Sequence, residues 1–447
     1  MPHTSLFPPP ARREQILHLA LPIIGGMMSQ NLLNLADAWM VGSLGEAALA
    51  ATGIANFLNF MAVAFITGIS PAVQAIAARR IGEGRGDEAA APLNGGLMLS
   101  ILIGLPLTLI LVIAAPWMLA ALNPDPAVVH EGTAYLQWRL VAIVAVGMNF
   151  SFRGYWSALK LAKYYMYTLV LMHVLNVIFS YSLIHGLFGL PRMGTAGAGL
   201  GTTLAIFVGT AAYVWIAQTR QPVQGLMTRL PTPEQFKSLL KLGLPSSVQQ
   251  LLFSSGFVAL FWIIGLVGTA ELAVANVLVT ITLTAILPAI GLGIAATTLV
   301  GQALGRKDAD DAHRWVWDVF KVGLWIFVPL SLGMVLFADF DLRFFLREQH
   351  LVDLGRLPLQ LVGATIALDG LGLIMMNALL GAGDSKRVMV VAVGLQWFLF
   401  LPIAYLLGPV FGFGLFAIWI ALGTSRLIQT AVFTAAWEKR AWVHIKI

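Results

Sequence analysis

The segment that decides the fold reads Gln30-Asn31-Leu32-Leu33-Asn34-Leu35-Ala36-Asp37, and it lies inside an apolar run over residues 16–41. A run of this length can span a bilayer as a helix, which takes about 20 largely apolar residues. A carboxylate near the bilayer centre costs roughly 2.5–3.5 kcal/mol on insertion scales, so it is usually turned inward and used. Asp37 therefore indicates a functional site inside a membrane protein.

Gln30, Asn34 and Asp37 follow the spacing i, i+4, i+7, which places them on one face of a helix. A headgroup contact at the outer end of the helix would be an alternative explanation for Asp37 alone. The two polar neighbours on the same face favour a water-lined cavity instead, and with it a transport function.

The composition excludes an ordinary soluble protein. Of the 447 residues, 58% are hydrophobic and 11% are charged, whereas soluble domains average about 25% charged residues. The mean hydropathy is +0.83. The chain has no cysteine, which excludes disulfides and thiolate metal sites. The segment from Met1 to Glu14 lacks the apolar core and cleavage site of a signal peptide, so we expect the first helix to remain in the mature protein.

Hydropathy and length predict twelve membrane-spanning helices with short connections. They cover residues 14–42, 47–78, 90–122, 132–157, 163–187, 194–218, 236–266, 270–303, 312–340, 354–381, 387–408 and 412–438. Basic residues, 27 against 21 acidic ones, gather in alternate connections. By the positive-inside rule this pattern places both termini in the cytoplasm, and it argues for membrane topology rather than for nucleic-acid binding.

The two halves of the chain repeat at a constant offset of 223 positions. This offset relates Pro22 to Pro245, Gly82 to Gly305, and Lys163 to Lys386. Each half holds six spans, so the repeats run parallel about an axis along the membrane normal. The predicted fold is therefore all-α and integral to the membrane, with an N-lobe (residues 1–218), a cytoplasmic linker (219–235) and a C-lobe (236–447).

Polar residues also occur in later spans. His173, Asn176 and Ser180 share one face of the fifth span. The sixth span opens with the small-residue run GTAGAGLGT (residues 194–202), which we interpret as close helix packing. For Thr202 at the end of this run two interpretations remain open: it packs, or it points its hydroxyl at Asp37.

Charged residues of the remaining spans have mixed interpretations. Asp369 lies near mid-membrane in the tenth span, and function is favoured over a structural pairing with a distant basic residue. Asp318 and Lys321, at i, i+3, are expected to neutralise each other. Arg153 is expected to extend to the cytoplasmic surface, while Arg426 lies deeper and has no explanation from the sequence.

Enzyme motifs are missing from the sequence. It has no nucleophile elbow, no His-x-x-His ligand spacing and no phosphate-binding loop with its lysine. Without an ATP-binding motif, transport is driven by an ion gradient or is passive.

Several segments, taken in order, resemble the multidrug and toxic compound extrusion (MATE) family. They are LPII (residues 21–24), NLADAWMVG (34–42), LGEAALA (44–50), ARRIGEG (78–84), MGTAGA (193–198) and LGAGDS (380–385). The resemblance covers nearly the whole chain, and neither the DinF-like nor the NorM-like bacterial branch is singled out. It implies a bacterial inner-membrane antiporter that exports amphipathic, often cationic, organic compounds in exchange for H⁺ or Na⁺.

The resemblance also implies roles for individual residues. Asp37, Asn176 and Thr202 match the family's N-lobe cation site, Gln30 matches a glutamine seven residues before the acid, and Pro22 matches a proline at which the first helix bends. The chain departs from both branches, because Ser180 stands where one has an aspartate and Phe253 where the other has a glutamate. Asp369 matches that second branch's other acid.

We expect Asp37, beside Asn176 and Thr202, to take up the coupling cation, with Gln30, Asn34, His173 and Ser180 as supporting polar residues. Desolvation favours the protonated carboxyl, and Na⁺ prefers several oxygen ligands, so H⁺ is favoured over Na⁺ at Asp37 or Asp369. Met27, Met172 and Met376 are candidates for a soft substrate surface, as are Met28, Phe57, Phe60 and Met61. No cofactor, no nucleic acid and no firm metal site are expected, and the partners are small organic molecules and membrane lipid around a monomer.

A lipid-linked oligosaccharide flippase of related architecture is the alternative. Such a protein needs a cationic cavity for pyrophosphate, so the surroundings of Arg153 and Arg426 discriminate between the two functions.

Overall fold

The computed structural model describes residues 7–221 and 223–447, and these residues form helices because a backbone in lipid must satisfy its own hydrogen bonds. The α-helices are α1 (Pro10–Gly42), α2 (Glu46–Thr67), α3 (Ile69–Gly82), α4 (Ala90–Leu122), α5 (Pro126–Val141), α6 (Ile143–Ala158), α7 (Ala162–His185), α8 (Gly194–Trp215), α9 (Pro233–Val267), α10 (Thr269–Ala285), α11 (Leu287–Gly305), α12 (Ala309–Leu336), α13 (Ala338–Arg343), α14 (Gln349–Ala382), α15 (Ser385–Gly394), α16 (Leu401–Tyr405) and α17 (Gly414–Glu438). Short 3₁₀ or π turns are η1 (Gly86–Glu88), η2 (Leu187–Gly189), η3 (Ile216–Arg220), η4 (Leu395–Phe400), η5 (Leu406–Val410) and η6 (Ala441–His444).

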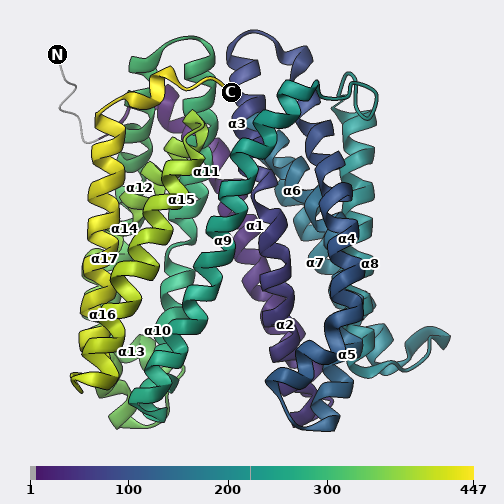
Figure 1. Cartoon of the computed structure of the whole chain (residues 1–447), viewed down its shortest axis with the longest axis vertical. Helices are drawn as coiled ribbons and strands as arrows, with labels where there is room; N and C mark the ends of the chain where they lie inside the picture. Colours follow the sequence, from purple (N-terminus) through teal and green to yellow (C-terminus); the bar gives the residue numbers. More distant parts are fainter. Residues whose placement is uncertain (1–6, 222) are drawn as a thin grey trace. The chain divides into compact units, whose positions relative to one another are not determined.

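Eleven helices of the described residues are long and apolar enough to cross a membrane, and their ends lie within a few residues of the predicted spans (Figure 1). The predicted span over residues 132–157 falls on α5 and α6, two helices of 16 residues each. They join at Ala142, whose backbone N–H bonds to the carbonyls of Arg139 and Leu140. Together α5 and α6 form one broken span, which gives the twelve spans of the predicted all-α membrane fold.

The chain divides into two compact units that do not coincide with the two halves of the sequence. One unit contains residues 7–24 with 248–447, and the other contains residues 25–221 with 223–247. Both boundaries lie within continuous helices, α1 and α9 (Figure 1). Ile24 and Ser247 are the last residues before the two boundaries, and they occupy equivalent positions in the repeat. In each half of the sequence, the first part of the first helix therefore belongs to the unit that the other half mainly forms.

Arg12 anchors the exchanged start of α1 to α12 within one unit. Its Nη1 is 2.6 Å from an oxygen of Asp311, its Nε is 2.5 Å from Asp318, and its guanidinium lies 3.6 Å from the ring centre of Trp315. Asp318 is thus paired with Arg12, and the predicted pairing with Lys321 is wrong. A planar guanidinium satisfies two carboxylates and a ring together, which the single ammonium of Lys321 cannot do.

Two glycines, again at equivalent positions in the repeat, mark the places where the exchanged segments pack. A Cβ on Gly68 would collide with the backbone of Gly243 and lie 2.6 Å from the backbone N of Ser247. A Cβ on Gly291 would lie 2.5 Å from Cγ1 of Ile24. In each unit the glycine lets a helix approach closely, against backbone at Gly68 and against the Ile24 side chain at Gly291.

The small residues at the start of α8 confirm the predicted packing role. A Cβ on Gly197, Gly199 or Gly201 would lie 2.5–2.7 Å from backbone atoms of Leu183, Tyr135 and Ser180, respectively. The absence of side chains at these three positions therefore brings α8 into direct backbone contact with α5 and α7.

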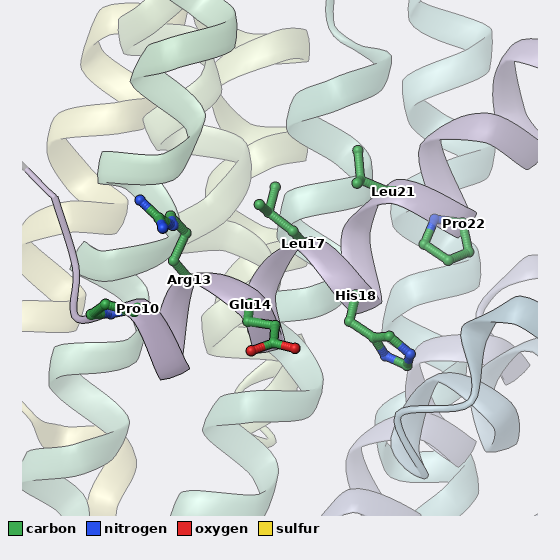
Figure 2. A pocket seen from close by; sticks show the side chains of 7 residues that line it. All are labelled: Pro10, Arg13, Glu14, Leu17, His18, Leu21 and Pro22. Carbon is green, nitrogen blue, oxygen red and sulfur yellow. The ribbon is translucent and has the colours of Figure 1, made fainter.

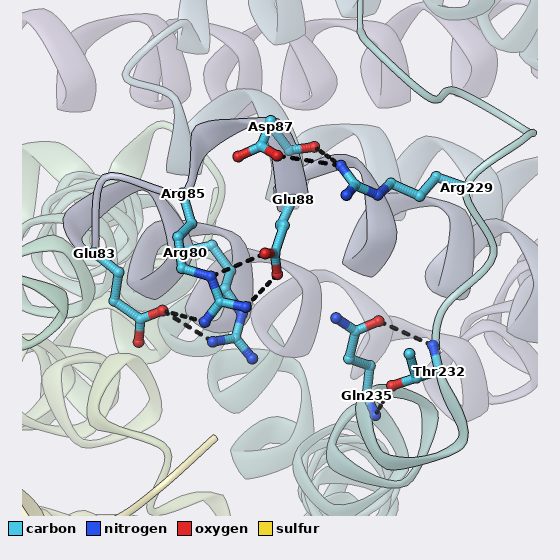
Figure 3. Close-up of polar contacts among 8 residues, drawn as sticks. All are labelled: Arg80, Glu83, Arg85, Asp87, Glu88, Arg229, Thr232 and Gln235. Carbon is cyan, nitrogen blue, oxygen red and sulfur yellow. Dashed lines mark hydrogen bonds and ion pairs between the residues drawn. The ribbon is translucent and has the colours of Figure 1, made fainter.

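Asn94 of α4 holds the segment between η3 and α9. Its amide donates to the carbonyl oxygens of Gly225 and Arg229 at 2.7 and 2.9 Å, and its oxygen accepts from the Met227 N–H at 2.9 Å. Figure 3 shows two further contacts of this segment: Arg229 meets Asp87, and Thr232 and Gln235 form a capping box at the start of α9. Asn94 therefore holds the backbone of the linker at three residues.

We expect Asn94→Ala to lower the free energy of unfolding by about 2 kcal/mol, since it strands two backbone carbonyls and one N–H in a half-buried place. The measurement is the thermal unfolding of purified protein in detergent. Asp87→Ala is the control, because its contact with Arg229 is exposed and 3.4 Å long, and exposed pairs contribute less than about 1 kcal/mol. Equal effects of the two substitutions would contradict the role of Asn94.

Candidate functional site

Asp37 lies in the last turns of α1, on the side of the helix that packs inside its unit. It is half-buried, between the buried residues Leu33 and Met40. The side-chain amide of Asn176 in α7 faces it, and Arg139 of α5 lies within electrostatic range. Asn176 Nδ2 is enclosed and forms no hydrogen bond of standard geometry with the described residues, so its donor capacity remains available toward Asp37.

Asn176 links two hydroxyl groups to this carboxylate. Its Oδ1 accepts from Ser180 Oγ at 2.6 Å and from Thr202 Oγ1 at 3.3 Å. Thr202 shares this proton with the Ala198 carbonyl, at 3.0 Å. The hydroxyl of Thr202 therefore binds Asn176, one step removed from Asp37. The structure brings together four of the residues predicted for the site, namely Asp37, Asn176, Ser180 and Thr202.

A second polar group surrounds His173, beside the first along α1 and α7. His173 Nε2 is 3.1 Å from Gln30 Oε1, its Nδ1 is 2.9 Å from Ser29 Oγ, and Gln30 Nε2 donates to Asn34 Oδ1 at 3.2 Å. Ser29 Oγ also donates to the Gly26 carbonyl at 2.7 Å. Gln30 thus connects His173 to Asn34, and Ser29 is a partner of His173 that the sequence analysis missed.

Arg139 is the other residue that the sequence analysis missed. Its Nη1 donates to the Tyr135 hydroxyl at 3.2 Å, and that hydroxyl donates to Asn56 Oδ1 at 2.8 Å. Tyr135 is 3% exposed, so it fixes the position of the guanidinium. The signal that could have identified Arg139 is the one that identified Asp37, an ionisable residue within an apolar span.

In the other unit, Asp369 of α14 is half-buried and lies within electrostatic range of Arg426 of α17. Arg426 lies 5.6 Å from the ring centre of Phe253, and its Nη1 donates to Gln429 Oε1 at 3.3 Å. Arg426, which has no explanation from the sequence, therefore lies near an aromatic ring and within electrostatic range of an acid. The described residues hold no group of three or more His, Asp or Glu side chains able to bind a metal.

Arg153 does not extend outward as predicted. Its Nε donates to Ser70 Oγ at 3.0 Å, and its guanidinium lies 4.7 Å from the ring centre of Phe150. These partners hold the side chain inside its own unit.

The predicted substrate residues differ in their surroundings. Met172 is buried against Gly209, and its sulfur accepts from Asn149 Nδ2 at 3.7 Å. Met376 is half-buried, with Gln249 Nε2 at 3.5 Å from its sulfur, and Met27 is half-buried in α1.

An open groove of about 630 Å³ runs along the first part of α1. Figure 2 shows the seven side chains that line it, all from this one helix: Pro10, Arg13, Glu14, Leu17, His18, Leu21 and Pro22. The predicted bend residue Pro22 is among them, and none of the residues predicted for cation coupling is. The groove and the polar cluster around Asp37 are therefore separate features of α1.

The MatE family model matches residues 22–182 and again residues 245–406. The two matched blocks begin at Pro22 and Pro245, the pair of prolines that the repeat relates to each other.

Curated relatives align over almost the whole chain. A probable multidrug resistance protein NorM of Bradyrhizobium diazoefficiens is 30% identical, covering 94% of this chain and 91% of that protein. One of Thermotoga maritima is 24% identical, covering 97% and 94%.

Among solved structures, an outward-facing multidrug resistance MATE family transporter of the MOP superfamily is similar in fold. It has a TM-score of 0.89 at 22% identity, with 97% of each chain covered. A MOP superfamily transporter from Pyrococcus furiosus, with a TM-score of 0.88 at 22% identity and 97% of each chain covered, is similar in fold as well.

Proposed function

Because this chain belongs to the MatE family of multidrug transporters, we propose that it exports amphipathic organic cations in exchange for a coupling cation taken up at Asp37. It is a multi-pass membrane protein and a transporter rather than an enzyme. The observation that carries the proposal is one half-buried carboxylate inside a membrane helix, faced by an amide and, through that amide, by two hydroxyls.

The donor and acceptor pattern of the cluster supports H⁺ over Na⁺. Asn176 Oδ1 already accepts from Ser180 and Thr202, so the group that Asn176 offers to Asp37 is its N–H donor. Na⁺ needs oxygen ligands on several sides, and a nitrogen donor cannot be one of them. Asp369 Oδ1 has no hydrogen-bond partner among the described residues.

Exchange follows from competition for a single negative charge. A proton on Asp37 abolishes the charge, and its release restores an anion that attracts an organic cation. Net exchange results if the switch between the outward-facing and inward-facing states is costly in free energy while the Asp37 carboxylate binds neither a proton nor an organic cation. We further propose that a single chain is the transporting unit in a bacterial inner membrane, with both termini cytoplasmic, in line with the basic residues of alternate connections.

A flippase for lipid-linked oligosaccharides is not favoured. Such a function needs free cationic groups for pyrophosphate, and both arginines in question already have protein partners: Arg153 contacts Ser70 and Phe150, and Arg426 contacts Phe253 and Gln429.

The test is export of tetraphenylphosphonium from vesicles that contain the purified protein, with Na⁺ absent and a pH gradient imposed. We expect export that follows the gradient and stops when the gradient is collapsed. Export that requires Na⁺ and ignores the pH gradient would replace the proton with Na⁺ in this proposal.

We expect Arg139→Gln to strengthen tetraphenylphosphonium binding about fivefold. The positive charge of Arg139 near Asp37 repels the cationic ligand by about 1 kcal/mol, and the substitution removes it. Equilibrium binding in detergent at neutral pH measures the effect. Arg139→Lys retains the charge and serves as the control. Weaker binding by the glutamine variant would show that Arg139 supports the site instead of opposing the cation.

A further inference from the structure

The part of α1 that precedes Asp37 carries two exposed amides, Gln30 and Asn34, on the same face as the acid. All three residues belong to the unit that contains residues 25–221 with 223–247. Polar side chains within a membrane span are costly in lipid, and they usually face the bundle interior or a water-filled space. Two exposed amides beside a carboxylate therefore indicate that this face of α1 borders water, where a ligand reaches it.

His173 of α7 determines which way the Gln30 amide points. Its Nε2 is 3.1 Å from Gln30 Oε1. An amide oxygen only accepts hydrogen bonds, so Nε2 of His173 is the donor. The other ring nitrogen, Nδ1, is 2.9 Å from Ser29 Oγ, so the imidazole is held at both of its nitrogens. The Gln30 oxygen is therefore fixed toward His173, and its nitrogen points away from that ring.

Gln30 in turn orients Asn34. Gln30 Nε2 donates to Asn34 Oδ1 at 3.2 Å. Each of the two amide oxygens thus already accepts a hydrogen bond, from His173 and from Gln30 respectively. Both N–H bonds of Asn34 Nδ2 and one of Gln30 Nε2 remain unused among the described residues. The face beside Asp37 therefore offers mainly hydrogen-bond donors.

The spacing of Asn34 and Asp37 suits one small molecule with two different groups. They are three residues apart in a helix, and side chains at this spacing have Cβ atoms about 5–6 Å apart. The carboxylate attracts a positive charge, whereas the free amide N–H groups bind an acceptor such as a carbonyl oxygen. A cation without an acceptor contacts only the acid and leaves these N–H groups to water.

We propose that Asn34, oriented by His173 through Gln30, determines specificity by selecting organic cations that carry a carbonyl oxygen a few bonds from the charge. The inference rests on the proposed function, because Asp37 supplies the negative charge for the cationic group. It narrows the substrate class, since among cations of equal size and charge those with the carbonyl bind more tightly. The preference comes from a hydrogen bond between neutral groups, so it is several-fold and not absolute.

The test compares two permanent cations in equilibrium binding to the purified protein at neutral pH. Benzoylcholine has an ester carbonyl between its ring and its charge, and trimethyl(4-phenylbutyl)ammonium has a chain of the same length without it. The preference is the ratio of the two affinities. Asn34→Leu is expected to weaken benzoylcholine binding about fivefold and to change the reference cation less than about twofold.

Asn276→Leu is the matched control. Asn276 is also an exposed asparagine of a membrane-spanning helix, but its amide donates to the Leu272 carbonyl of its own helix, α10, at 3.0 Å. The preference for benzoylcholine is expected to stay at the level of the original protein in this variant.

A second set of variants tests the role of His173. His173→Leu removes the donor that holds Gln30, so the preference is expected to fall to that of Asn34→Leu. His173→Gln retains a side-chain N–H donor and is expected to restore most of it. Combining His173→Leu with Asn34→Leu is expected to cause no further loss of preference, because both act on the same amide. A merely structural role of His173 would weaken both cations alike and leave the ratio unchanged.

Equal losses of the two cations in Asn34→Leu, or a full preference in His173→Leu, would overturn the inference. Failure of the proposed function is seen separately in Asp37→Asn. That variant is expected to lose binding of both cations, and unchanged binding of both would show that the charge of Asp37 does not attract them.

Discussion

Asp37→Asn is expected to reduce export of tetraphenylphosphonium to the level of vesicles without protein. Asparagine has a similar shape and can still face Asn176, but it can neither take up a proton nor attract an organic cation. Because exchange depends on competition for this one charge, its removal eliminates coupling instead of merely weakening it. Export driven by an imposed pH gradient measures the effect, alongside the amount of protein in the membrane.

Asp125→Asn is the matched control. It makes the same chemical change at the exposed N-cap of α5, where the carboxylate accepts from the Ala127 N–H at 2.9 Å. Asparagine caps helices as well as aspartate does, so export is expected to stay at the level of the original protein. Full export by Asp37→Asn would remove Asp37 from the mechanism.

Gly68→Ala is expected to prevent accumulation of the folded protein, or to destabilise it by about 3 kcal/mol or more. The added methyl group would meet the backbone of Gly243 and Ser247, and a backbone cannot rotate away as a side chain can. The collision lies where the first part of α9 packs on the other helices of its unit. Yield and thermal unfolding in detergent measure the outcome.

Two other glycines provide graded controls. Gly53, in α2, has open space where a methyl group would be added, so Gly53→Ala is expected to be neutral or slightly stabilising. Gly291→Ala would meet the flexible side chain of Ile24 at 2.5 Å and is expected to cost less than Gly68→Ala. A Gly68→Ala protein as stable as Gly53→Ala would show that the packing at Gly68 tolerates displacement.

The membrane spans could be predicted from the sequence because length and hydropathy are local properties of the chain. The repeat could be predicted as well, and contacts support it. Gln30 meets His173, and the residues at the equivalent positions of the second half, Phe253 and Gln396, also meet, through a 3.1 Å bond from the Gln396 side chain to the Phe253 carbonyl.

The partners of individual side chains could not be predicted, because helical periodicity indicates which face a residue occupies and not what packs against that face. Arg139 and Ser29 were missed in this way, and Thr202 was given two interpretations, neither of which named Asn176 as its partner. Asp318 was assigned to the nearest opposite charge in sequence, although Arg12 reaches it from the far end of the chain.

The exchange of helix segments between the units bears on how such a chain arose. A solitary six-span ancestor would have lacked the segment that fills its own unit at the position of Gly68. Two copies would have had to supply this helix segment to each other, as in an intertwined homodimer. Fusion of two such copies would join them through the linker and preserve the reciprocal donation, so neither half of the present gene is expected to yield an autonomous protein.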